Sequence, residues 1–160
     1  MLKKIFPYIV IVVVVVIIRT FIVTPIRVSG SSMYPTIKDG NVMILVKVTK
    51  YFKDYQRNDI VVLKENGDYL IKRVIWLNGE RIACHDGKIY INDSELDNDY
   101  GIGETNDFTE VLIGKNSYFV MGDNRAISKD SRIIGTVSEK EILGYANLII
   151  YPFKSIDIVK

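Results

Sequence analysis

Residues 68–93 read DYLIKRVIWLNGERIACHDGKIYIND, and this stretch decides the fold class. Strand-like segments alternate in it with tight-turn dipeptides, in the order residues 68–77, Asn78-Gly79, residues 81–84, Asp86-Gly87 and residues 88–91. The segments are rich in β-branched and aromatic residues, which favour strands. Asn-Gly and Asp-Gly favour two-residue hairpin turns because these residues adopt positive φ readily. Strands joined in this way pair antiparallel, so the stretch predicts an antiparallel sheet.

The same pattern continues on both sides of this stretch. Further strands are expected at residues 41–48, 59–63, 117–121 and 144–151, and one helical turn at residues 138–142. Residues 94–109 are polar and acidic with two glycines, which predicts a loop. We therefore expect a mostly β domain over residues 24–160, with a small β and loop insert at about 79–116.

The composition excludes several classes of function. The 160 residues are 48% hydrophobic and 25% charged with a net charge of +2, and no basic stripe indicates a nucleic-acid partner. Cys84 is the only cysteine and His85 the only histidine, so neither an intrachain disulfide nor a metal site is expected. No feature of the sequence calls for a cofactor.

Residues 5–18 are apolar and uncharged, and Arg19 and Thr20 precede three more apolar residues. As a helix, residues 5–23 would span about 28 Å, close to the thickness of a hydrocarbon core. The lysines within residues 1–4 predict a short cytoplasmic N-terminus and an extracytoplasmic domain. The alternative is a cleaved secretory signal, but no small-x-small cleavage site follows. We therefore expect a single-pass anchor in the plasma membrane.

Residues 29–36, SGSSMYPT, directly follow the expected anchor. Gly30 permits positive φ or a close substrate approach, and Pro35 fixes the chain, so the segment suits a serine held on a rigid turn. The N–H of such a serine could stabilise an oxyanion. Taken alone, the composition of the segment favours a linker.

Lys72 lies among apolar residues within the strand of residues 68–77. A lysine in water has a pKa of about 10.4 and is protonated at neutral pH, but desolvation lowers the pKa by up to about 3–5 units. Burial would therefore make Lys72 a usable base, although an ordinary strand lysine has the same pattern. Residues 122–132, GDNRAISKDSR, concentrate polar groups between apolar strands. There Asp130 and Arg132 can form an ion pair, and Ser128 can orient a neighbouring amine.

Together these segments resemble the type I (leader) signal peptidases, in the short form of the Gram-positive members. The resemblance rests on Ser-Met-Tyr-Pro-Thr after a membrane helix, Asp59-Ile-Val-Val, Lys72-Arg-Val and Gly-Asp-Asn-Arg-x-x-Ser-x-Asp-Ser-Arg, in that order. It implies a signal-peptidase or LexA-like β fold and a Ser-Lys dyad protease. It further implies that Ser32 is the nucleophile and Lys72 the general base.

The resemblance also implies roles for the neighbouring residues. The Ser32 N–H would bind the oxyanion, with Gly30 where some members carry a hydroxyl and with Ser31 adjacent. Ser128 would hydrogen-bond the lysine amine, and Asp130 and Arg132 would support it. Substrate contacts are expected from Met33, Tyr34, Ile71 and Val74.

The implied substrates are signal peptides of exported preproteins with small residues at P1 and P3, cleaved at the bilayer, with the secretion translocon as a further expected partner. Trp76 and Asn78 replace a glycine and a proline that are usual in the family. This difference suggests a narrower set of substrates, such as pilin or surface-protein precursors. A sortase is disfavoured because adjacent strand residues Cys84 and His85 point to opposite faces. A non-catalytic, membrane-tethered β adaptor is the alternative outside enzymes.

Overall fold

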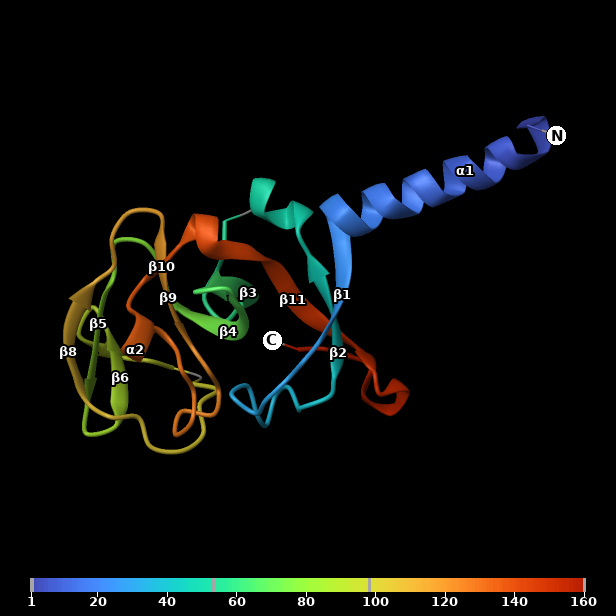
Figure 1. The fold of residues 1–160 in the computed structure, drawn as a ribbon. Coiled ribbons are helices and arrows are strands. Elements are labelled where there is room, and N and C mark those ends of the chain that lie inside the picture. The colour runs from blue at the N-terminus through green and yellow to red at the C-terminus, as the bar shows by residue number, and fades with distance from the viewer. Residues whose placement is uncertain (1, 53, 98, 160) are drawn as a thin grey trace.

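The structure, a computed structural model, describes residues 2–52, 54–97 and 99–159. It begins with α1 (Leu2–Ile17), which continues as the π-helical turn η1 (Ile18–Ile22). Residues Ile5–Ile22 are long and apolar enough to cross a membrane, and their side chains are not buried against the domain. Figure 1 shows α1 leaving the β domain as a single projecting helix. Met1 of the expected cytoplasmic segment lies outside the described residues.

Two antiparallel sheets form the rest of the described chain, which confirms the mostly β fold class. The spatial order of the larger sheet is β1 (Val23–Arg27), β2 (Val42–Val46), β11 (Ile142–Tyr151), β3 (Ile60–Glu65), β4 (Asp68–Trp76), β9 (Ser117–Met121) and β10 (Val137–Ser138). In addition, β12 (Asp157–Ile158) pairs with β11. The short helices are η2 (Val48–Tyr51), α2 (Ser131–Ile134), η3 (Glu139–Glu141) and η4 (Phe153–Ser155).

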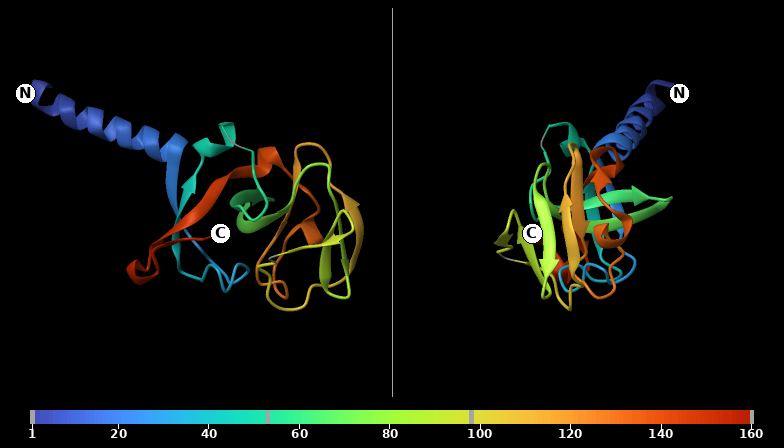
Figure 2. Two further views of the ribbon diagram at one scale, coloured as in Figure 1. Left: turned by 180° about the vertical axis from the view of Figure 1, so that it is seen from behind. Right: turned by 90° about the vertical axis from the view of Figure 1, so that its left-hand side faces the viewer.

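The smaller sheet has the order β7 (Ser94–Glu95), β6 (Lys88–Ile91), β5 (Arg81–His85) and β8 (Phe108–Leu112). It lies at the end of the domain away from α1, as Figure 1 and the left view in Figure 2 show. Apolar side chains from β4 and β9 pack against it, among them Trp76 and Phe119. Residues 79–116 therefore contain a second sheet, whose apolar cluster is shared with β4 and β9.

Several element boundaries differ from the sequence expectation, for example at residues 41–48, where the observed strand is β2 (Val42–Val46). Val23 already belongs to β1, so the helical segment ends at Ile22 rather than at residue 23. The expected loop 94–109 contains β7, and its last residues begin β8. The strand of residues 108–112 was missed because its exposed polar positions dilute the alternation of apolar residues.

Candidate active site

Ser32 lies in a turn that follows β1 and leads back to β2. Backbone hydrogen bonds from Val28 N to Asn41 O and from Gly40 N to Val28 O close the base of this loop. Within it, Met33 is 2% exposed and Ile37 is fully buried, so two apolar side chains anchor the turn in the core. The Asn124 N–H donates to the Ser32 carbonyl at 2.9 Å, which ties the turn to residues 122–125.

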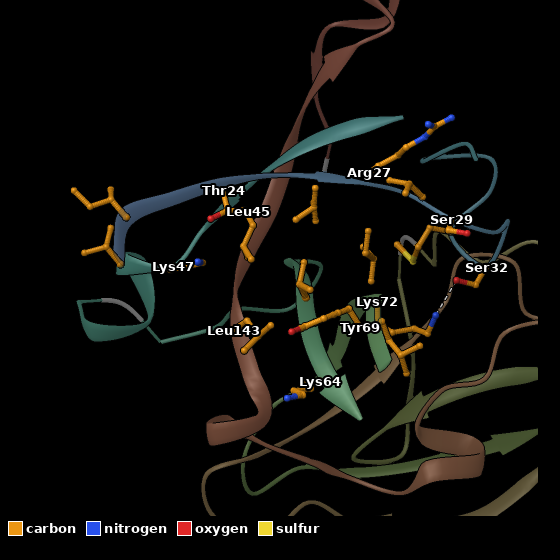
Figure 3. Close-up of a pocket in the computed structure, with 18 of the residues that line it drawn as sticks. Thr24, Arg27, Ser29, Ser32, Leu45, Lys47, Lys64, Tyr69, Lys72 and Leu143 are labelled. Atoms are coloured by element: carbon orange, nitrogen blue, oxygen red, sulfur yellow. Dashed lines mark hydrogen bonds between the residues drawn. The ribbon is translucent and has the colours of Figure 1, made fainter. Parts of the chain in front are cut away.

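Lys72 lies in the middle of β4, between β3 and β9, and is 2% exposed. Its Nζ donates to the Ser32 Oγ at 2.8 Å, a contact between residues 40 positions apart in the sequence. Figure 3 shows the two side chains extending toward each other across this hydrogen bond. The structure therefore brings the side chains of Ser32 and Lys72 into contact, as the sequence predicted.

Burial lowers the pKa of the Lys72 ammonium from 10.5 to about 8, against the opposing charges of Asp130 and Asp123, while Arg132 lowers it further. A change of this size corresponds to about 3 kcal/mol in favour of the neutral amine. At pH 7 about one such amine in ten is neutral, compared with fewer than one in a thousand for a lysine in water. A neutral amine has a lone pair that can accept the serine proton, so the pair has the geometry of a nucleophile with its base.

The ion pair expected from the segment 122–132 is present. Arg132 donates to Asp130 through both Nε and Nη2 at 2.8 Å, and the Gly122 N–H donates to the same carboxylate at 3.0 Å. Burial alone would raise the pKa of Asp130, but these hydrogen bonds hold it below its usual value. Asp130 is fully buried, so the pair fixes an anion close to the lysine.

Ser128 requires a correction. Its side chain is buried and packs over Gly122, where an added Cβ would lie 2.2 Å from Ser128 Oγ and 2.5 Å from the Ser32 carbonyl oxygen. However, within the described residues the expected bond from its Oγ to the Lys72 amine is not formed. The hydroxyl lies on the side of Asp130 and helps to lower the pKa of that carboxyl. The Lys72 amine instead donates to Ser32. Ser128 therefore lies beside Ser32 and Lys72 without a hydrogen bond to either.

Sequence reasoning missed a second buried ion pair directly beside the base. Arg73 donates to Asp123 through Nε at 2.8 Å and Nη2 at 2.7 Å, and neither side chain is exposed. Thr36, from the loop that carries Ser32, also donates to Asp123. The pair therefore links β4, the segment 122–125 and the serine loop. The arginine next to Lys72 was the available signal, because an arginine inside a buried strand needs an anionic partner.

A groove of about 920 Å³ opens beside Ser32 and Lys72 and extends toward the end of the anchor helix. Figure 3 shows Leu45, Lys47 and Leu143 at its far end. Of the expected substrate contacts, Met33 and Ile71 line it, as does Gly30.

Val74 and Tyr34 do not line the groove, which corrects two of the expected contacts. Val74 is fully buried and packs in the core cluster that contains Tyr55 and Tyr118. Tyr34 and Ser31 are exposed on the turn outside the groove. Alternation along a strand predicts which side chains lie on the same face of the sheet. It does not predict whether that face packs in the core or lines a groove, and Val74 was misassigned for this reason.

The two departures from the family pattern lie away from the groove. Trp76 is fully buried, its indole N–H donates to the Arg81 carbonyl at 3.2 Å, and it packs in the core under the smaller sheet. Asn78 is exposed in the turn after β4. The tryptophan therefore supports the insert and gives no ground for a narrower substrate set.

Comparisons with known proteins show the family of this chain. The model of the family "Signal peptidase, peptidase S26" matches residues 1–151. The chain is 36% identical to signal peptidase I S of Bacillus subtilis over 155 residues, which cover 89% of this chain and 84% of that protein. It is 38% identical to signal peptidase I U of the same organism over 150 residues, covering 85% and 80%. A crystal structure of a signal peptidase I from Enterococcus faecalis superposes with a TM-score of 0.52 at 32% identity, covering 58% of this chain and 97% of that one. The chain therefore belongs to the signal peptidase family, peptidase S26.

Proposed function

We propose that the protein removes N-terminal signal peptides from exported preproteins, with Ser32 as nucleophile and Lys72 as general base. Its family makes the chain a peptidase. The observation that carries the residue assignment is the 2.8 Å contact between Lys72 Nζ and Ser32 Oγ, with the amine buried and its pKa lowered to about 8. The groove beside the pair provides the space for an extended peptide.

In the proposed mechanism, neutral Lys72 accepts the Ser32 proton as Oγ attacks the carbonyl carbon of the P1 residue. The backbone N–H of Ser32 stabilises the oxyanion of the tetrahedral intermediate. Lys72 then protonates the leaving amine, and the mature protein departs. Water, deprotonated by the same amine, hydrolyses the acyl-enzyme and frees Ser32.

We propose that small residues at P1 and P3 bind in this groove. Beside Ser32 and Lys72 its walls come from Met33, Ile71 and Gly30. A peptide bound in extended form directs alternate side chains to the same wall, so P1 and P3 would both face this surface.

Mass spectrometry of a purified preprotein with an Ala-x-Ala site, incubated with the full chain in detergent, tests the function and the nucleophile together. We expect a single cut after the second alanine, no cut with Ser32→Ala, and cleavage within about threefold of wild type with Ser31→Ala. Ser31 is the matched control because it is adjacent and exposed but outside the groove. Cleavage by Ser32→Ala at the wild-type rate would refute the assignment.

We also propose that the Ile5–Ile22 helix anchors the enzyme in the plasma membrane with residues 24–160 outside the cell. Residues 1–4 would be cytoplasmic, and the secretion translocon would be a neighbour in the membrane. Lys3 and Lys4 precede the helix, and positive charge is retained on the cytoplasmic side. The opening of the groove toward the end of this helix would place the dyad within reach of a peptide leaving the bilayer.

Protease added to intact protoplasts tests this orientation. The β domain should be digested from outside, leaving a membrane-retained N-terminal fragment. In inside-out vesicles the domain should be protected. Digestion of the domain only in inside-out vesicles would reverse the proposed topology.

A further inference from the structure

Residues 99–102, named here the bracing loop, lie directly against residues 122–125, which are hydrogen-bonded to the turn that holds Ser32. The Ile102 N–H donates to the Asp123 carbonyl at 2.7 Å, and the Arg125 N–H donates to the Ile102 carbonyl at 3.0 Å, which forms a parallel bridge between Ile102 and Asn124. Between these two bonds, the Asn124 N–H donates to the Ser32 carbonyl at 2.9 Å. Hydrogen bonds therefore connect the bracing loop to residues 122–125, and residues 122–125 to Ser32.

Side chains of the bracing loop strengthen this attachment. The Asp99 carboxylate accepts two hydrogen bonds from the Arg125 guanidinium, one of them at 2.8 Å, and Arg125 Nε donates to the Gly122 carbonyl at 3.1 Å. Arg125 is 3% exposed. A Cβ at Gly101 would lie 2.3 Å from the Arg125 Cζ, so only glycine allows the guanidinium to pack here.

Tyr100 connects the loop to the other half of the dyad. Its ring lies 4.0 Å from the Arg73 Cζ, a cation–π contact with the arginine that follows the base in sequence. Arg73 is fully buried and is paired with Asp123. The ring therefore covers the ion pair that joins β4 to the serine loop, while none of residues 99–102 lines the substrate groove.

We propose that Asp99, Tyr100 and Ile102 are positioning residues for the dyad, an inference that rests on the proposed roles of Ser32 and Lys72. They hold residues 122–125 and the Arg73–Asp123 pair so that Oγ and Nζ stay within hydrogen-bond reach. Misplacement of reacting groups by about 1 Å costs on the order of 100-fold in rate. Loss of the brace therefore lowers kcat, while KM stays the same because the groove is untouched.

Steady-state cleavage of a preprotein by wild type, Tyr100→Ala, Tyr100→Phe and Asp99→Ala, with Tm measured for each, tests the proposal. Tyr100→Ala and Asp99→Ala should lower kcat about 10-fold or more with KM within about twofold. Tyr100→Phe should keep kcat within about twofold, because the ring face makes the contact. Glu104→Ala removes an exposed carboxylate from the same segment and should leave kcat unchanged.

Each outcome decides the matter. If wild type does not cleave, the proposed function fails. If wild type cleaves and both alanine variants, folded by their Tm, keep kcat within about twofold, the brace alone is refuted. A loss in Tyr100→Phe as large as that in Tyr100→Ala would equally refute the role of the ring. If Tyr100→Ala does not fold, Tyr100→Leu supplies the comparison, since it keeps apolar cover over Arg73 without a ring.

Discussion

Replacing Lys72 with methionine should lower kcat/KM for a preprotein by about 10³-fold, with the fold retained. A positioned general base contributes about 10² to 10⁴ in rate, and here the same amine also protonates the leaving group. Methionine approximates the length of the lysine stem and suits a site that is 2% exposed. The substitution also removes the cost of burying an amine, so a loss of stability is not expected.

The measurement is kcat/KM with the full chain in detergent, alongside thermal unfolding of each variant. Lys115→Met is the matched control, because Lys115 is exposed. This substitution should change kcat/KM by no more than about twofold and Tm by no more than about two degrees. If Lys72→Met cleaves within tenfold of wild type, another group activates Ser32 and the proposed mechanism is wrong.

Replacing Asp123 with alanine should lower the free energy of unfolding by about 3–5 kcal/mol, because Arg73 then remains buried with an unpaired charge. Both side chains are fully buried, and the guanidinium donates twice to this carboxylate. For a domain of this size the expected loss is a large part of the total stability. Denaturant unfolding of the full chain in detergent, followed by the fluorescence of Trp76, measures it.

Two controls separate a buried charge from a general effect of substitution. Glu95→Ala removes an ion pair with Lys88 in which both side chains are more than half exposed, so it should cost less than about 1 kcal/mol. The double variant Arg73→Met with Asp123→Leu should recover most of the stability, because it removes both buried charges together. A loss in Asp123→Ala no larger than in Glu95→Ala would contradict this account of the pair.

Local sequence patterns predicted the strands well because burial repeats at a fixed interval along them. Residues 88–91 were predicted with the observed bounds of β6, and the turns at Gly79 and Gly87 have the expected positive φ. The pairing of Ser32 with Lys72 was predicted from motif resemblance. Spacing alone could not give it, since residues 40 positions apart are brought together only by the packing of the serine loop on β4.

The long-range polar contacts were not predictable in the same way. Nothing in the local sequence of Asp123 distinguishes a turn residue from the buried partner of Arg73, and the acidic stretch around Asp99 has the composition of a solvated loop. Likewise, the motif predicted that Ser128 lies near Ser32 and Lys72, and it does. The motif did not predict its hydrogen bonds, because these depend on how the side chains pack. Such contacts depend on which segments the fold brings together.

The central claim, that burial lowers the pKa of Lys72 far enough for its amine to act as a base near neutral pH, is tested most directly by an NMR titration of its side chain in lysine-labelled protein, assigned with Lys72→Met. Because burial lowers the pKa from 10.5 to about 8, the signal should change with a midpoint near pH 8, and the amine should be neutral above it. The unfolded chain binds the proton more tightly, so this group makes the fold more stable as pH rises from about 8 to 10.5. A Lys72 ammonium that stays protonated up to pH 10 would contradict the account.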